Sequence, residues 1–216
     1  LARAARDNGW DDLGARVLRL TGNALRLSGD LDTAVTMLAA AQQQLKDQGD
    51  TSRILRATEL LALARVEQGH PDHGRSLFNQ VLAEAVRTAD TRAEAAGQLG
   101  LARIARDTGR IAEAEERVAA SIAAAERGKH KALVLEAVCF TGELCLATRR
   151  VEPAEQAYAR ALELALQRGS DGELPRIWAR LGQLARARGS LERAEACLRT
   201  ALSWTRSVGG SAADVR

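Results

Sequence analysis

The chain has 216 residues, of which 46% are hydrophobic, 27% are charged and only 3% are aromatic. This is the composition of a globular protein rather than a disordered one, and its many Ala, Leu, Arg and Glu residues favour helix over strand. The net charge of +3 is mild for this length, which argues against a protein that binds nucleic acid directly.

A period of 40 residues runs through the chain and sets its predicted elements. Small residues recur at one position of every period: Ala34, Gly74, Ala114, Ala154 and Ala194. They recur at a second position: Gly22, Ala62, Ala102, Gly142 and Gly182. A large apolar residue recurs at a third: Leu38, Phe78, Val118, Tyr158 and Leu198. A fixed period of about 20–50 residues is typical of a solenoid, whose units bury their apolar faces only against neighbouring units.

The first unit, residues 12–50, is predicted to form a pair of helices. Its first half has apolar residues at helical spacing, among them Leu13, Val17 and Leu25. The dipeptide Gly29-Asp30 then separates two helices, because Gly suits the left-handed position after a helix and Asp caps a new N-terminus. The second helix is expected over about residues 31–48.

The same pair is predicted in four more units, over about 51–90, 91–130, 131–170 and 171–208. First helices should begin near residues 12, 52, 92, 132 and 172, and the period accommodates helices of about 16–18 residues. Pro71 is expected in a first helical turn, where its missing N–H costs little, and Thr91–Glu94 and Ser170–Glu173 have the spacing of a capping box. The fold class predicted is therefore all-α, a right-handed α-solenoid of five stacked helix–turn–helix repeats in a single domain, 1–216.

Both ends of the chain are predicted to continue into further repeats. Leu1–Asn8 aligns with the end of a second helix, so we expect a remnant helix at the N-terminus. Gly209–Arg216 aligns with the linker before another first helix. Because the chain starts at Leu1 rather than Met, we expect it to be part of a larger protein. No polar capping helix is evident, so the apolar end faces are expected to self-associate.

These repeats resemble tetratricopeptide repeats. The fifth unit carries the motif most clearly, with Trp178-x-x-Leu181-Gly182 followed by Gly189, Ala194, Leu198 and Ala201. The period is longer than the family's usual value of about 34 residues, and the proline that usually closes each repeat is replaced, by Lys46, Val86, Glu126, Leu166 and Arg206. Such long repeats are similar to those of bacterial signalling ATPases, LuxR-type activators and kinesin-light-chain-like scaffolds.

The resemblance implies that the first helices line a concave face on which peptides bind. Carried over by position, this face presents twelve mainly basic residues: Arg16, Arg19, Asn23, Arg26, Arg56, Glu59, Arg103, Arg106, Glu143, Arg176, Arg180 and Gln183. Arg side chains form bidentate, charge-assisted hydrogen bonds, so such a groove suits an acidic peptide, a C-terminal carboxylate or a phosphate. The alternative interpretation is a solvated polar face that is rich in Arg because of genome composition.

Catalytic and metal-binding chemistry is not predicted. His70 and His73 have only His130 elsewhere in the chain to join them, and no carboxylates or cysteines stand at ligand spacing. Cys139, Cys145 and Cys197 form an odd, sparse set that is typical of buried, reduced thiols in a cytosolic protein. No P-loop, zinc-protease or nucleophile-elbow motif occurs, and no apolar run is long enough to span a bilayer. We therefore expect no enzyme, no cofactor or metal, no membrane partner and a cytoplasmic location.

The function predicted is a protein–protein interaction module that binds a peptide or protein segment, expected to be acidic, in an Arg-rich groove. The module would belong to a bacterial regulatory or signalling protein. The alternative is a ligand-sensing regulatory domain of a LuxR-type or ATPase transcriptional regulator, in which a small anionic effector occupies the groove.

Overall fold

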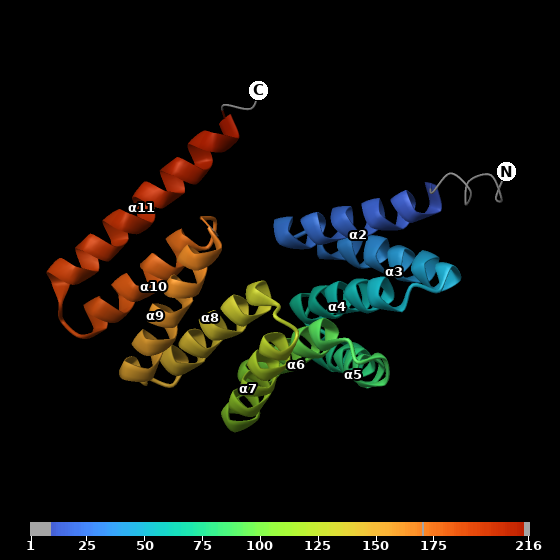
Figure 1. The fold of residues 1–216 in the computed structure, drawn as a ribbon, viewed down its shortest axis with the longest axis horizontal. Coiled ribbons are helices and arrows are strands. Elements are labelled where there is room, and N and C mark those ends of the chain that lie inside the picture. Colours follow the sequence, from blue (N-terminus) through green and yellow to red (C-terminus); the bar gives the residue numbers. More distant parts are fainter. Residues whose placement is uncertain (1–9, 170, 214–216) are drawn as a thin grey trace. The chain divides into compact units, whose positions relative to one another are not determined.

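The computed structural model describes residues 10–169 and 171–213, and within these ranges it contains ten helices and no strand (Figure 1). The first six are α2 (Trp10–Ser28), α3 (Leu31–Gln48), α4 (Thr51–Glu67), α5 (Pro71–Thr88), α6 (Thr91–Asp107) and α7 (Ile111–Arg127). The last four are α8 (Lys131–Ala147), α9 (Val151–Arg168), α10 (Leu174–Ala187) and α11 (Leu191–Ala213). The all-α, pairwise helical architecture is confirmed. The remnant helix expected over Leu1–Asn8 lies outside the described residues.

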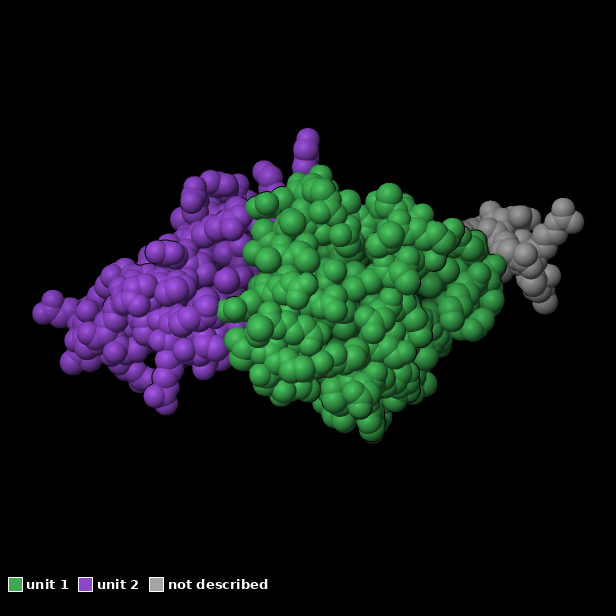
Figure 2. Space-filling model, turned by 90° about the horizontal axis from the view of Figure 1, so that it is seen from below, with its two compact units in different colours: residues 1–128 green, residues 129–216 purple. Residues whose placement is uncertain are grey.

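The chain divides into two compact units, residues 1–128 and 129–216, which Figure 2 colours green and purple. In the first unit each helix from α2 to α7 packs against the next along the chain, and α4 also contacts α6. In the second unit α8 packs on α9, α9 on α10, and α10 on α11. The single domain expected over residues 1–216 stays a prediction.

The helix boundaries follow the 40-residue period. The second helices begin at positions 31, 71, 111, 151 and 191, as the spacing of the glycines predicted. Gly29, Gly69, Gly109 and Gly189 have φ values between 74° and 90°, the left-handed conformation that ends a helix. Arg149 occupies the corresponding place in the fourth pair and adopts the same conformation, with φ of 59°. The turn is therefore kept even where glycine is lost.

Aspartates rather than capping boxes begin two of the first helices, α4 and α6. The side chains of Asp50 and Asp90 accept hydrogen bonds from the backbone N–H groups of Arg53 and Ala93, at 3.0 and 2.9 Å. The capping box expected at Thr91–Glu94 is wrong, because Asp90 occupies the N-cap position and Thr91 already lies within the helix. For the second expected box, Ser170 lies outside the described residues.

Helix α11 differs from the sequence prediction, which placed a linker from Gly209 onward. The helix instead continues to Ala213 and has 23 residues. A glycine in a helix interior costs only about 1 kcal/mol, and no proline follows Leu191 to end the helix. The glycine pair Gly209-Gly210 therefore does not end α11.

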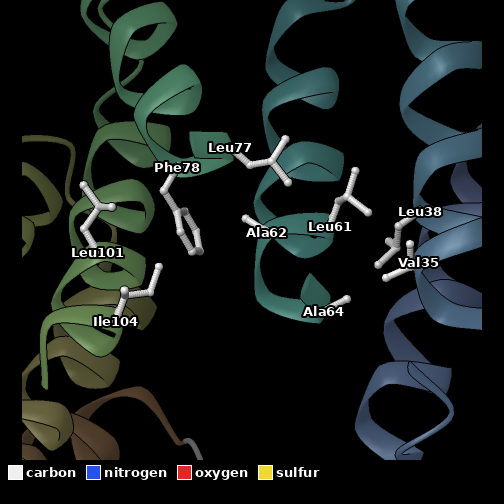
Figure 3. Packing of buried hydrophobic residues seen from close by; sticks show 9 residues of the cluster. All are labelled: Val35, Leu38, Leu61, Ala62, Ala64, Leu77, Phe78, Leu101 and Ile104. Atoms are coloured by element: carbon white, nitrogen blue, oxygen red, sulfur yellow. The ribbon is translucent and has the colours of Figure 1, made fainter. Parts of the chain in front are cut away.

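The core is built from large side chains of the second helices that fit against small residues of the first. Phe78 and Tyr158 are each 1% exposed. A Cβ atom added to Gly142 would lie 2.7 Å from the Tyr158 ring, and one added to Gly100 would overlap Phe78. Figure 3 shows one such cluster in the first unit, formed by Val35, Leu38, Leu61, Ala62, Ala64, Leu77, Phe78, Leu101 and Ile104. Small residues therefore recur because the aromatic and aliphatic side chains need their space.

Candidate functional site: an arginine-lined cavity in the first unit

The twelve residues predicted for the binding face are divided between the two units. The first unit holds eight of them, on three helices: Arg16, Arg19, Asn23 and Arg26 on α2, Arg56 and Glu59 on α4, and Arg103 and Arg106 on α6. The second unit holds four, on two helices: Glu143 on α8, and Arg176, Arg180 and Gln183 on α10. A single groove that includes all twelve stays a prediction.

Three of the predicted residues, Arg16, Arg19 and Arg56, line one cavity of about 510 Å³. Ala15 from α2, Leu45 from α3 and three residues at the start of α4 complete its lining: Asp50, Ser52 and Arg53. The sequence prediction missed Arg53, although a signal was present. Residues three apart on a helix lie on the same side, and Arg53 precedes Arg56 by three positions.

The cavity carries an excess of positive charge. Asp50 is the single carboxylate among its described lining residues, and it is already engaged by Arg53, with 2.9 Å between the Arg53 Nε and an Asp50 oxygen. The other carboxylate oxygen of Asp50 caps α4. Arg16, Arg19 and Arg56 form no hydrogen bond or ion pair with any side chain that the structure describes. Three guanidinium groups therefore face one cavity without a paired carboxylate among the described side chains.

The pKa of Arg19 is lowered from its ordinary value, chiefly because the group is partly buried. Repulsion by Arg56, Arg16 and Arg92 lowers it further, and Glu59 partly opposes these effects. The guanidinium group stays protonated at neutral pH because arginine ordinarily titrates far above neutral pH. An anion bound beside Arg19 would relieve the repulsion that these neighbours exert on one another.

Other predicted residues of the first unit are tied to partners within the fold. Asn23 accepts two hydrogen bonds from Arg26, at 3.1 and 3.2 Å, and Arg26 also forms an ion pair with Glu67 of α4. Glu59 pairs with Arg92 of α6 at 2.6 Å. Arg106 pairs with Asp107 at 2.8 Å. Two of these pairs join neighbouring helix pairs, Arg26–Glu67 and Glu59–Arg92, so they act as structural links between repeats.

The four predicted residues of the second unit form mixed-charge contacts. Arg180 lies 3.7 Å from Glu143 and donates a hydrogen bond of 3.1 Å to Gln183. Arg176 lies 3.3 Å from Glu173 and close to the Cys139 thiol. Burial raises the pKa of that thiol, and Arg176 opposes the rise. Unlike the cavity of the first unit, this surface pairs its predicted arginines with carboxylates.

The described residues show little else that could perform chemistry. No group of three or more His, Cys, Asp or Glu residues is placed to hold a metal ion within the described ranges. All three cysteines are buried and free. Within the same part of the chain, no helix combines the length and apolar character that crossing a bilayer requires.

The fifth helix pair carries a recognisable family signature. A family model for the tetratricopeptide repeat matches residues 175–207, which include the Trp178-x-x-Leu181-Gly182 motif. A crystal structure from Podospora anserina, described as a kinesin light chain with nearly identical TPR-like repeats, is 18% identical, with a TM-score of 0.64 over 90% of this chain and 95% of the other. Residues 175–207 are therefore similar to a tetratricopeptide repeat, and the chain as a whole shares the fold of a TPR-like solved structure. The resemblance to the long-repeat bacterial regulators stays a prediction.

Two further solved structures share the fold of this chain. BtubC from P. vanneervenii is 20% identical, with a TM-score of 0.73 over 96% of this chain and 88% of the other. The Rap conjugation gene regulator of plasmid pLS20, in complex with the Phr* peptide, is 13% identical, with a TM-score of 0.78 over 97% of this chain and 57% of the other. No curated protein matches the sequence significantly. At these identities the similarity establishes the fold alone.

Proposed function

We propose that this protein is a non-catalytic interaction module that binds an acidic peptide or protein segment, and that Arg16, Arg19 and Arg56 contact that segment. The observation that carries the proposal is the cavity that these three unpaired arginines line on adjacent first helices. The Rap regulator, which has a similar fold, forms a complex with a peptide. We further propose that the module acts in the cytoplasm, within a bacterial regulatory or signalling protein.

Charge complementarity is the physical basis of this proposal. Carboxylates of an acidic segment would form charge-assisted hydrogen bonds with the three guanidinium groups that have no partner in the described part of the chain. The arginines already paired with carboxylates would have to break those pairs first, so they contribute less. Because the arginines of the cavity are partly solvated, binding should weaken as salt screens the charges.

Selection from a library of displayed peptides tests this function. The unchanged chain is compared with an Arg16→Gln/Arg19→Gln/Arg56→Gln variant and with a control, Arg87→Gln/Arg193→Gln/Arg199→Gln. The control removes the same charge from second helices, at side chains that are 68%, 61% and 77% exposed. We expect the unchanged chain and the control to enrich acidic sequences and the first variant to lose them. Affinity for the enriched peptides should fall between about 50 and about 300 mM salt.

Two results of the selection would contradict the proposal. One is enrichment of the same sequences by both triple variants while all three proteins remain folded by circular dichroism. The other is an affinity that does not change with salt, because this would show that the arginines do not supply the binding energy.

The size of the cavity favours a second candidate, the sensing of a small anionic effector. A volume of about 510 Å³ lies within the range of about 300–1,000 Å³ that is usual for small-molecule sites. On this interpretation, a small anion without any peptide raises the melting temperature in a concentration-dependent way. An unchanged melting temperature across a panel of anionic metabolites would exclude the effectors tested and leave the peptide proposal in place.

We also propose that the chain self-associates through apolar side chains exposed on α2, which include Leu20 at 50% and Leu27 at 71%.

A further inference from the structure

Three of the arginines that line the cavity differ from most others of the first unit, because they have no partner among the described side chains. Arg53, which also lines the cavity, has a carboxylate oxygen of Asp50 at 2.9 Å. Outside the cavity, a carboxylate oxygen lies within 4.0 Å of Arg26, Arg75, Arg87, Arg92, Arg106, Arg110, Arg117 and Arg127. By contrast, no carboxylate oxygen of a described side chain lies within 4.0 Å of Arg16, Arg19 or Arg56. An Arg-rich composition alone does not account for three unpaired guanidinium groups around a single cavity.

The 40-residue period explains how two of these arginines come to lie on neighbouring first helices. Arg16 and Arg56 are separated by one repeat of 40 residues, so they occupy equivalent positions on α2 and α4. The equivalent position of α6 is Ala96, so α6 contributes no arginine at this position. Glu59 takes the position equivalent to Arg19, but it is engaged by Arg92 at 2.6 Å. Asp50, which lines the cavity, and Glu59, which lies beside Arg19, are therefore both paired with other arginines.

We propose that the cavity binds the phosphoryl group of a phosphomonoester, carried either by a peptide or by a small metabolite. This inference rests on the proposed function and specifies the chemistry of its ligand. A carboxylate brings one charge and two oxygens, whereas a phosphoryl group brings a charge of about −1.5 to −2 and three terminal oxygens. Three guanidinium groups match three oxygens, and the forked geometry of arginine suits phosphate.

The pH dependence of binding is set by the ligand. The ionisable groups that line the cavity are Arg16, Arg19, Arg53 and Arg56 together with Asp50, and Glu59 and Arg92 lie beside Arg19. No histidine is among the described residues that line it. The second ionisation of a phosphomonoester has a pKa of about 6, so the ligand itself changes charge between about pH 5 and pH 7.5.

Calorimetric titration of the full chain tests the proposal. The probes are inorganic phosphate, phenyl phosphate, and an acetylated, amidated Gly/Ala heptapeptide with a central phosphoserine, serine or glutamate. We expect the phosphoserine peptide to bind about tenfold or more tightly than the glutamate peptide, since hydrogen bonds between charged groups are the strong ones. Its affinity should fall about tenfold between pH 7.5 and pH 5, while that of the glutamate peptide changes little.

Matched variants locate the binding. Arg19→Gln and Arg56→Gln should each weaken binding of the phosphoserine peptide about tenfold. The control Arg87→Gln removes an exposed, paired arginine of α5 and should leave the affinity unchanged. In arginine-labelled protein, inorganic phosphate should shift the side-chain Nε–H resonances of Arg19 and Arg56 and leave that of Arg87 in place. This second readout stays informative if a variant fails to fold.

Comparing the affinities of the phosphoserine peptide and phenyl phosphate distinguishes the two sources of the phosphoryl group. A phosphoserine peptide that binds about tenfold more tightly than phenyl phosphate indicates a phosphorylated segment, and equal affinity indicates a small metabolite. Equal binding of phosphoserine and glutamate peptides, or equal effects of Arg19→Gln and Arg87→Gln, would overturn the inference. If acidic, unphosphorylated sequences are still selected through the cavity arginines, the proposed function survives that result. If phosphate binds but no acidic segment does, the proposed interaction function is wrong and the proposed phosphoryl site is still supported.

Discussion

Tyr158 combines deep burial with an unsatisfied hydroxyl group. Its side chain is 1% exposed, and the hydroxyl has no hydrogen-bond partner among the described residues. Burial raises the pKa of this phenol above its ordinary value, Glu143 adds to the rise and Arg180 opposes it. The folded state therefore holds Tyr158 neutral at pH values where the unfolded chain would ionise.

The chain has one tyrosine, so its ionisation can be followed directly. Because the folded-state pKa is raised, the stability linked to Tyr158 is fully present below the unfolded pKa of about 10 and is lost as pH rises above it. At about pH 10.5, we expect absorbance near 295 nm to show no tyrosinate in the folded protein. In denaturant, about half or more of the Tyr158 side chains should be ionised at the same pH. Ionisation near pH 10 with intact helical circular dichroism would contradict the burial of this residue.

Tyr158→Phe is the matched control for this titration. It removes the hydroxyl without changing the ring that packs beside Gly142. Since the hydroxyl has no partner to lose, the variant should be as stable as the parent or slightly more so. It should also abolish the absorbance change altogether.

At the scale of the helix pair, a recurring small residue sets how closely two helices approach. Ala34, Ala114 and Ala154 are each 0% exposed. At the equivalent place in the second pair, a Cβ atom added to Gly74 would lie 2.3 Å from Val66 and 3.0 Å from the carbonyl oxygen of Ala62. The contact has no room for a larger side chain.

Ala114→Leu should therefore destabilise the protein. Overpacking at such a site costs about 1–3 kcal/mol, which corresponds to a fall in Tm of roughly 2–12 °C for a chain of this size. Ala119→Leu is the control, because Ala119 is exposed on the same helix and leucine is a good helix former. Thermal unfolding of both variants is the measurement, and equal melting temperatures would show that the position assigned to Ala114 is wrong.

At the scale of the whole molecule, the sequence predicted the elements better than the site. The second helices start at the expected residues because glycine turns and small-residue contacts are local and repeat with a fixed period. Position within the repeat also identified Arg16, Arg19 and Arg56 as candidates. It did not show which arginines are paired, because the carboxylates come from other helices. Arg26 meets Glu67, 41 residues away, and Arg92 meets Glu59, 33 residues away. These separations differ from the period, so repeat alignment does not reveal them.

The apolar side chains on the outer face of α2 give the last prediction. Leu13, Val17, Leu20 and Leu27 are 57%, 51%, 50% and 71% exposed, and their spacing of four, three and seven residues puts them on one helical stripe. In solenoids such a stripe is normally covered by a neighbouring helix.

We therefore expect the 216-residue chain to associate as its concentration rises, with an increase in weight-average mass in sedimentation velocity. Leu20→Glu/Leu27→Glu should keep the chain monomeric, because association would bury the two charges. The control Val86→Glu/Leu166→Glu changes two residues that are 74% and 57% exposed on α5 and α9, outside the stripe, and should associate like the parent. A parent chain that stays monomeric at all concentrations, or a stripe variant that associates equally well, would show that this face does not mediate self-association.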